Sequence, residues 1–294
     1  MILISLKLEL LNDKPKPAIT ALPFLGGVLH GFFENLIRAH EPEAAHALGM
    51  TQNNLYKYYA VLPPPYDPGA GKKTDINLLG CGIMLYGQAR QFLPSILPIL
   101  QYWREIRLDG RCDKIKKHEI HICSPGNPPR LWNEKQMASI EPVNPGFNYT
   151  FTVGDSVVLS FLTPLVLENA KQKAKGAANA PPALLRLTRS LAKRIQALEP
   201  ELAETLRIGS TAWIEAEEQI RAIAIRQHHL TRVQWHYGSR TKKHPITRSG
   251  LTGRIHYDGP IPAPIMALLN WGCWFGAGQG ASLGQGMYAI TIPE

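Results

Sequence analysis

The sequence has few acidic residues relative to basic ones. Among its 294 residues, 23 are Asp or Glu and 32 are Lys or Arg, so the formal net charge is +9 at pH 7. An excess of positive charge favours polyanionic partners, because it attracts them over long distances and releases their counterions on binding. Nucleic acid is therefore the first class of partner to consider.

The sequence also lacks a hydrophobic run long enough to span a membrane, which requires about 20 apolar residues. The most apolar stretches, residues 92–103 and 264–280, are interrupted by prolines, polar residues or glycines. Residues 1–10 alternate like a strand and lack the charged start and cleavage site of a signal peptide. We therefore expect a cytoplasmic protein that does not bind membranes.

Cysteine is scarce and scattered. The four cysteines, Cys81, Cys112, Cys123 and Cys273, form no Cys-x-x-Cys pair. Structural zinc sites gather four ligands from closely spaced pairs, and small secreted proteins use a denser set of cysteines for disulfides. We therefore expect buried free thiols, no metal and no cofactor.

Glycine is abundant near the C-terminal end. Residues 276–288 read Gly-Ala-Gly-Gln-Gly-Ala-Ser-Leu-Gly-Gln-Gly-Met-Tyr and lead into a strand-like segment, residues 287–292. A dinucleotide-binding glycine loop would instead open a helix within a βαβ unit. Because glycine lets backbone N–H groups approach phosphates, we expect Gly278, Gly280 and Ser282 to contact a nucleic-acid backbone.

This pattern resembles the C-terminal signature of the CRISPR-associated endoribonucleases that process repeat RNA, members of the RAMP superfamily. In that family a Gly-x-Gly, a Ser-Leu-Gly-x-Gly and a final strand follow a short helix. Here residues 251–263 read as a strand and turn, and residues 264–271 as the helix. The resemblance is strongest over residues 228–292. Residues 160–167 also resemble the Thr-Pro-Leu strand that opens the family's second domain, and residues 25–48 resemble its first helix.

The resemblance implies an α+β fold of two ferredoxin-like (RRM-like) domains in tandem. We expect domains at residues 1–155 and 156–294, the second with a basic helical insertion at 168–207 and the glycine-rich loop at 276–288. The hydrophobic periodicity of the first half agrees with this order of elements. It predicts an amphipathic helix from Leu25, a second helix over residues 88–102 bent at its two prolines, and the strands 2–10, 56–62, 76–86, 105–108, 114–123 and 148–161.

Two basic regions are candidates for RNA contact. Within the predicted insertion, Arg186, Arg189, Lys193 and Arg194 recur at three- and four-residue spacing. On one helical face they would follow a phosphate backbone. A solvated helix face is the alternative that the charges alone leave open.

The second region, residues 226–248, contains six Lys or Arg, four histidines and no acid, with Trp235 and Tyr237 among them. Unbroken positive charge with stacking aromatics is typical of proteins that bind structured RNA. The candidate contacts are Arg232, Arg240, Lys242, Lys243 and Arg248.

The resemblance also implies a reaction. Family members cleave RNA without metal by attack of a 2′-hydroxyl on the adjacent phosphate, which leaves a 2′,3′-cyclic phosphate and a 5′-hydroxyl. Such a reaction requires a base, an acid and cations that stabilise the phosphorane. In the family these groups come from the first helix and the loop after it, commonly a histidine with a tyrosine and a lysine nearby.

This sequence departs from that setting, because the family's usual histidine position falls on Gly49. His46 lies one turn earlier, and His30 falls where a helical catalytic tyrosine often sits. His30, Glu34 and Arg38 share one helical row off the apolar face. We predict His30 as acid or base, Arg38 as phosphate clamp and His46 as the alternate base. A surface helix with an incidental histidine remains the alternative.

Further candidates follow the helix. They are His40, Tyr56, Lys57 and Tyr58. Each also has a plain structural interpretation, since a histidine favours a helix C-terminus and a Tyr-Lys-Tyr-Tyr run suits a strand surface.

The combined interpretation is a metal-independent endoribonuclease that processes CRISPR precursor transcripts within their repeats. The resemblance further implies that the protein stays on the repeat hairpin of the mature guide RNA and joins other subunits of an effector complex. The helical insertion and the lost histidine indicate a divergent branch, such as one of type IV systems. A non-catalytic RAMP subunit that binds guide RNA structurally is the alternative.

Overall fold

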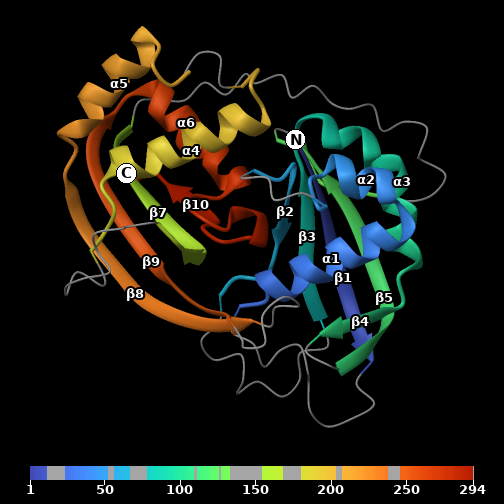
Figure 1. Cartoon of the computed structure of the whole chain (residues 1–294). Coiled ribbons are helices and arrows are strands. Elements are labelled where there is room, and N and C mark those ends of the chain that lie inside the picture. The colour runs from blue at the N-terminus through green and yellow to red at the C-terminus, as the bar shows by residue number, and fades with distance from the viewer. Residues whose placement is uncertain are drawn as a thin grey trace. The chain divides into compact units, whose positions relative to one another are not determined.

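The computed structural model forms two compact units. Unit 1 comprises Met1–Phe147 and Tyr237–Ile246, and unit 2 comprises Asn148–His236 and Thr247–Glu294 (Figure 1). The structure describes residues 1–11, 24–51, 56–66, 78–108, 111–125, 127–132, 154–167, 180–202, 207–237 and 246–293. The domain boundary near residue 155 stays a prediction.

Unit 1 contains one antiparallel sheet with the strand order β2-β3-β1-β5-β4. The strands are β1 (Ile2–Leu11), β2 (Tyr59–Leu62), β3 (Leu78–Leu85), β4 (Glu105–Leu108) and β5 (Arg111–Cys123), and the short β6 (Arg130–Leu131) also pairs with β5. The helices are α1 (Gly26–His40), α2 (Pro42–Ala47) and α3 (Leu93–Tyr102). These elements lie at or near their predicted positions.

The core of unit 1 forms between the sheet and the helices. In β1 the even-numbered side chains from Ile2 to Leu10 are buried, whereas the odd-numbered ones are not, as the pleat of a strand requires. Leu29, Phe33 and Ile37, at four-residue intervals along α1, are fully buried in the same cluster. The predicted apolar face of this helix is therefore confirmed.

The predicted second helix over residues 88–102 is divided into a 3₁₀ turn and an α-helix. Residues 87–92 form a 3₁₀ turn that passes into α3 at Leu93, with Pro94 in the first turn and Pro98 inside the helix. Proline is tolerated in a first turn because its missing N–H would have no partner there. The geometry thus changes from 3₁₀ to α just before Pro94.

Unit 2 contains a second antiparallel sheet, with the strand order β10-β7-β9-β8. Its strands are β7 (Gly154–Leu165), β8 (Ile225–Tyr237), β9 (Ile246–Ile261) and β10 (Tyr288–Thr291). Its helices are α4 (Leu184–Leu198), α5 (Thr211–Arg221) and α6 (Ala263–Phe275), with a 3₁₀ turn at Ala281–Leu283. The predicted strand after the glycine loop is confirmed, and it ends the sheet at β7.

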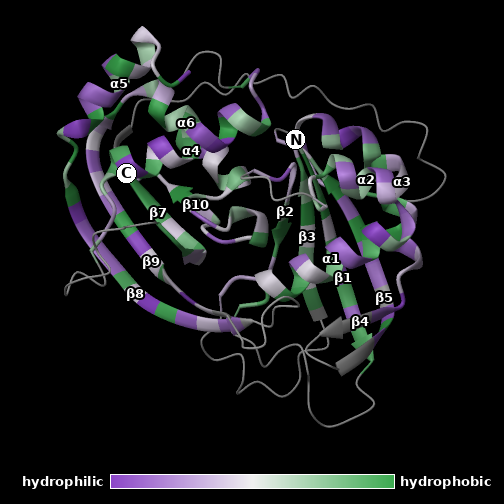
Figure 2. Ribbon diagram, viewed as in Figure 1, coloured by the Kyte–Doolittle hydropathy of each residue, from purple (hydrophilic) through white to green (hydrophobic). Residues whose placement is uncertain are grey.

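Hydropathy differs between the strands of the two sheets. In Figure 2, β1 and β3 are largely hydrophobic, whereas β8 carries long hydrophilic stretches. In β8 only Val233 and Trp235 are buried among its described side chains. A strand that is polar on both faces is typical of a sheet edge that meets solvent or a polar partner.

The predicted helical insertion over residues 168–207, split near Pro181 and Pro182, is described only at residues 180–202 and 207 and stays a prediction as a whole. Between residues 180 and 202 the helix covers only Leu184–Leu198. Pro181 and Pro182 precede it, and it ends at Glu199 immediately before Pro200. Proline favours the start of a helix and prevents its continuation, so the prolines confine α4 to these fifteen residues. Residues 168–179 and 203–206 lie outside the described part.

The glycine-rich loop is tied to its own unit by backbone hydrogen bonds. Ala277 N–H donates to Gly286 O (2.9 Å), and Gly286 N–H donates to Pro164 O at the end of β7 (3.0 Å). Gly286 has φ of 70°, and a Cβ built there would collide with the carbonyl oxygen of Ala277. Only glycine fits this position without displacing the loop from β7.

We predict that Gly286→Ala lowers the free energy of unfolding by more than about 1 kcal/mol, the usual cost of a left-handed backbone in a residue with a Cβ. Gly31→Ala is the matched control, because Gly31 lies in α1 and a Cβ there meets nothing within 4 Å. That control should stabilise the protein by up to about 1 kcal/mol. Urea unfolding measures both variants, and equal stabilities for the two would contradict the steric argument.

Candidate active site and nucleic-acid interface

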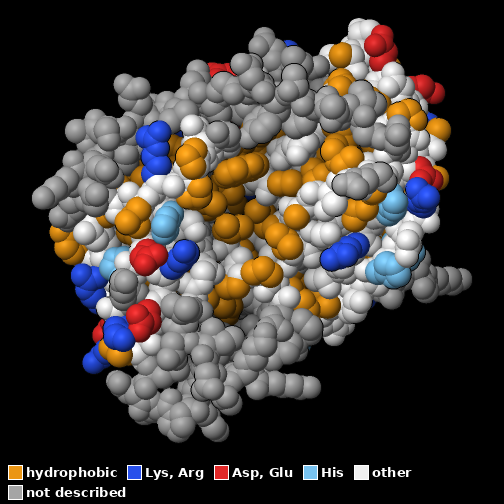
Figure 3. Space-filling model, turned by 180° about the vertical axis from the view of Figure 1, so that it is seen from behind, with side chains coloured by type: hydrophobic (Ala, Val, Ile, Leu, Met, Phe, Trp, Pro, Cys, Tyr) orange, Lys and Arg blue, Asp and Glu red, His pale blue; other side chains and the backbone are white. Residues whose placement is uncertain are grey.

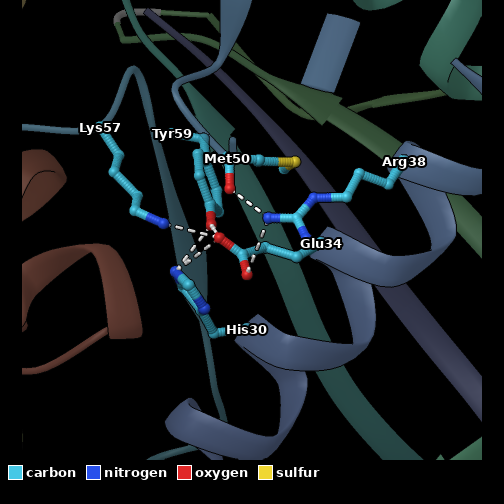
Figure 4. Close-up of polar contacts among 6 residues, drawn as sticks. All are labelled: His30, Glu34, Arg38, Met50, Lys57 and Tyr59. Atoms are coloured by element: carbon cyan, nitrogen blue, oxygen red, sulfur yellow. Dashed lines mark hydrogen bonds and ion pairs between the residues drawn. The ribbon is translucent and has the colours of Figure 1, made fainter. Parts of the chain in front are cut away.

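A cluster of polar side chains lies between α1 and β2. His30, Glu34 and Arg38 are successive members of one row along α1, and Tyr59 opens β2 across from them (Figure 4). His30 Nε2 lies 3.9 Å from Glu34 Oε1, and Arg38 Nη2 lies 4.0 Å from Glu34 Oε2. The predicted row of neighbours is therefore present.

Glu34 is the centre of the cluster. Its Oε1 accepts hydrogen bonds from Lys57 Nζ (2.6 Å) and from the Tyr59 hydroxyl (2.8 Å). The Lys57 and Glu34 side chains are 21% and 18% exposed, so this ion pair is largely removed from water. In Figure 4 all of these groups converge on the carboxylate. A half-buried carboxylate with three cationic or hydroxyl neighbours is held in one geometry.

His30 is buried, with 8% of its surface exposed. Its Nε2 lies 2.6 Å from the Tyr59 oxygen, and the two rings stack with centroids 5.2 Å apart. The alternative of an incidental histidine on a helix surface is therefore wrong. This part of the helix faces β2, whose Tyr59 contacts both His30 and Glu34.

The cluster perturbs the acidities of its members. Burial lowers the pKa of His30 to about 4, with Glu34 opposing and Lys57 adding to the shift. Burial alone would raise the pKa of Glu34, but the charges of His30 and Lys57 and the hydrogen bonds from Lys57 and Tyr59 bring it below its usual value. Burial and Glu34 raise the pKa of Tyr59. At neutral pH the cluster thus contains an uncharged imidazole, a carboxylate and a protonated phenol.

Arg38 has a partly structural contact. Its Nη2 donates a hydrogen bond to the carbonyl oxygen of Met50, in the segment after α2 (Figure 4). The side chain is nevertheless 43% exposed. A guanidinium carries five donors, so one that braces a loop can still present others to a phosphate.

The other histidine candidates lie elsewhere on unit 1. His46 is exposed on α2, and its Nδ1 is hydrogen-bonded to Thr51 Oγ1 (3.1 Å). His40 is exposed in the last turn of α1. Gly49, where the family has its histidine, follows α2 with φ of 76°. His30 is therefore the histidine that joins the carboxylate cluster.

Among the tyrosine and lysine candidates, the structure adds one residue to the site. Lys57, one of the predicted candidates, belongs to the cluster. The other two, Tyr56 and Tyr58, are half-buried. The sequence analysis named Tyr56, Lys57 and Tyr58 as candidates but not Tyr59, the last residue of the same run. The alternation of a strand could have found it, since Tyr59 and Val61 share the face that is buried against the helices.

The basic residues of α4 do not form one exposed row. Arg194 is buried, with 6% exposed, because it follows the apolar face of α4 at Leu187 and Leu191. Arg189 forms a two-point ion pair with Glu217 of α5, at 2.6 and 2.7 Å. Lys193 is exposed and Arg186 is half-buried. Arg194 was therefore wrongly predicted as an exposed RNA contact, and the charge of Arg189 is compensated within the chain.

The basic residues of β8 and β9 are exposed. In Figure 3, Lys or Arg and His side chains gather over these strands, on the right of the view. Trp235, one of the two aromatic residues of this region, is 2% exposed and belongs to the core. Arg240, Lys242 and Lys243 lie outside the described residues. The exposed cations and histidines are Arg226, His228, His229, Arg232, His236, Arg248 and Arg254.

The glycine loop uses part of its backbone within the chain. The Gly278 N–H, predicted to contact phosphate, donates to Ser190 Oγ of α4 (3.1 Å), and the Gln279 N–H donates to Val166 O (2.7 Å). Gly280 and Ser282 are half-buried at the start of the 3₁₀ turn. The physical reason given for the Gly278 prediction is thus wrong. The glycines allow the loop to pack closely on β7 and α4.

Within the described residues, no three His, Cys, Asp or Glu side chains gather in a way that would hold a metal ion. In that same part of the chain, no helix combines the length and the hydrophobicity needed to cross a bilayer.

Comparisons with known proteins agree with this architecture. The family model of the CRISPR-associated endoribonuclease Cas6 matches residues 159–288. None of the curated protein sequences matches the chain. Three solved structures illustrate the similarity, at sequence identities that show the fold alone.

The first is a product complex of Thermus thermophilus Cas6, with 16% identity, a TM-score of 0.62 and coverage of 99% of both chains. The second is described as a RAMP protein binding different RNA substrates; it has 14% identity and a TM-score of 0.58, and the match covers 99% of this chain and 100% of the other. A Cas6-related protein from Pyrococcus furiosus has 13% identity, a TM-score of 0.53 and the same coverage. The predicted α+β fold of two ferredoxin-like domains is confirmed.

We predict that the burial of His30 makes stability depend on pH. Its pKa is about 4 in the folded protein and about 6.5 when unfolded, so below pH 6.5 the unfolded state binds a proton that the folded state does not. Stability is therefore lost as the pH falls. Between pH 7 and pH 5 this group accounts for about 2 kcal/mol. In urea unfolding, the free energy of unfolding should fall between pH 7 and pH 5 by that much less in His30→Gln than in the wild type.

The matched control is His46→Gln, which changes an exposed histidine and leaves His30 in place. It should keep the wild-type pH dependence of unfolding. An identical decrease in wild type and His30→Gln would show that His30 is not a buried neutral imidazole.

Proposed function

We propose that the chain is a Cas6-like protein of the RAMP superfamily that cleaves CRISPR precursor RNA within the repeats. The Cas6 family model that matches residues 159–288 and the shared fold support this proposal. The cluster of His30, Glu34, Lys57 and Tyr59 carries this proposal, since it combines a neutral imidazole with a lysine ammonium. The proposed reaction uses no metal and leaves a 2′,3′-cyclic phosphate.

The groups of the cluster suit the steps of this reaction. His30 takes the proton of the attacking 2′-hydroxyl while the bond from O2′ to phosphorus forms and the bond from phosphorus to O5′ breaks. The leaving 5′-oxygen takes a proton from the Lys57 ammonium. A histidine with a pKa near 4 is neutral at pH 7 and therefore serves as a base rather than as an acid. Arg38 binds the phosphate and stabilises the phosphorane.

The exposed cations of β8 and β9 are the proposed binding surface for the repeat. Arg226, Arg232 and Arg254 are exposed there together with several histidines. Phosphate contacts of this kind supply affinity and position the RNA, and they weaken as salt concentration rises. Lys193 of α4 is a further candidate contact.

The proposal extends to the partners of the protein. After cleavage it stays on the repeat hairpin of the guide RNA as a subunit of a CRISPR effector complex in the cytoplasm. The alternative is a RAMP subunit that binds guide RNA without cleaving it. The same experiment distinguishes this role from that of a nuclease.

The decisive experiment incubates the purified protein with repeat RNA in EDTA, beside the same RNA carrying one 2′-deoxy nucleotide at the scissile position. We expect cleavage of the first RNA and not of the second, because the deoxy substrate lacks the nucleophile. His30→Ala should reduce the rate by a factor of about 100 or more with little change in binding. Tight binding of both RNAs without cleavage would establish the structural role instead.

Binding is tested separately by replacing Arg232 and Arg254 together with alanine. We expect weaker repeat binding and a shallower dependence of log K on log salt, by roughly one unit for each lost phosphate contact. Arg189→Ala is the matched control, since Glu217 already neutralises that guanidinium. An equal loss of affinity in the control and the double variant would contradict a specific surface on β8 and β9.

A further inference from the structure

The line of hydrogen bonds from His30 to Glu34 determines where its protons lie. The Tyr59 oxygen is 2.6 Å from His30 Nε2 and 2.8 Å from Glu34 Oε1. A tyrosine hydroxyl has one proton, and an ionised carboxylate can only accept. The phenol proton therefore points to Glu34, and the contact with His30 requires a proton on Nε2.

We propose that Glu34, acting through Tyr59, holds the neutral His30 as the tautomer protonated on Nε2. Nδ1 then carries the lone pair of the ring, and it is the atom that accepts a proton from a substrate. This inference rests on the proposed function in one respect only: the proton that Nδ1 accepts is taken to be that of the RNA 2′-hydroxyl. Glu34 is thus a positioning residue, which acts through Tyr59 and His30.

The same chain of bonds supports the charged form that catalysis produces. When Nδ1 takes a proton, the imidazolium still donates through Nε2 to Tyr59, and Tyr59 donates to the carboxylate. A hydrogen-bonded line that ends in a negative charge stabilises a developing positive charge, in the way that the aspartate of a serine protease supports its histidine. His30 sits 3.9 Å from Glu34 Oε1, so the direct electrostatic contribution is also favourable.

Two cations keep Glu34 ionised and therefore an acceptor. Lys57 shares Oε1 with Tyr59 at 2.6 Å, and Arg38 of α1 lies 4.0 Å from Oε2. In the described part of the chain, Glu34 and Lys57 are the charged groups that act on His30, and the Tyr59 hydroxyl contacts it. Both cations also limit how strongly the carboxylate raises the basicity of the ring. The geometry therefore fixes the tautomer more firmly than it raises the proton affinity.

Two substitutions of Glu34 separate the effect of its hydrogen-bond acceptor from the effect of its negative charge. In Glu34→Leu the phenol loses its acceptor and turns its proton to His30 Nε2, so the ring proton moves to Nδ1. In Glu34→Gln the amide oxygen still accepts from Tyr59, so the wild-type tautomer persists. Glu217→Gln is the matched control, because Glu217 also forms a short ion pair with an arginine but lies in unit 2.

The test is ¹⁵N NMR of the histidine side chains at pH 7, in protein without RNA, with His30 assigned from its absence in His30→Ala. We expect protonation on Nε2 in the wild type, Glu34→Gln and the control, and on Nδ1 in Glu34→Leu. The inference would be overturned by a wild-type ring protonated on Nδ1, or by a tautomer that is the same in Glu34→Leu as in the wild type. If Glu34→Leu does not fold, the wild type and Tyr59→Phe decide, since the latter should lose the single tautomer.

Single-turnover cleavage then shows whether Glu34 acts through His30. We expect Glu34→Leu to reduce the rate by a factor of about 100 while repeat binding is kept, and to have no further effect when combined with His30→Ala. An equal loss in the His30→Ala background would overturn the assignment. A wild type that binds repeat RNA without cleaving it would refute the proposed function, whereas the NMR result would still decide the tautomer.

Discussion

Burial of one apolar stripe of α1 in the core of unit 1 determines the geometry of the candidate site. Leu29, Phe33 and Ile37 are fully buried, and their positions fix the rotation of the helix about its axis. Once that rotation is set, His30 and Glu34 face the start of β2, and Arg38 lies at the exposed end of the same row. The hydrophobic effect is not chemically specific, but by fixing the rotation of the helix it orients the polar residues of the candidate site.

This position explains the unusual protonation states. A histidine at the edge of a core loses hydration and stays neutral, whereas a carboxylate tolerates the same burial only with cations and hydroxyl donors around it. Lys57 and Tyr59 supply those partners from the segment that enters β2. The acidities of the candidate catalytic groups therefore result from packing, and no bound ligand is needed to explain them.

The candidate RNA surface is decided by the same competition between burial and exposure. Arg194 and Trp235 both belong to basic sequence regions, yet both are buried because they lie on the inward faces of α4 and β8. Arg189 faces outward but forms an ion pair with Glu217 on α5, 28 positions later in the chain. Counting positive charges along a sequence therefore overestimates the surface that is open to a polyanion.

The sequence by itself determined the order and type of most elements, the apolar face of α1 and the glycine loop followed by a strand. These features depend on local periodicity and turn chemistry, which act between neighbouring residues. Only the tertiary structure decided that Tyr59 completes the site, that Gly278 packs rather than presents its N–H, and that His30 is buried. Each of these depends on contacts between segments distant in the sequence, because burial and hydrogen-bond partners are properties of the assembled sheet and helices.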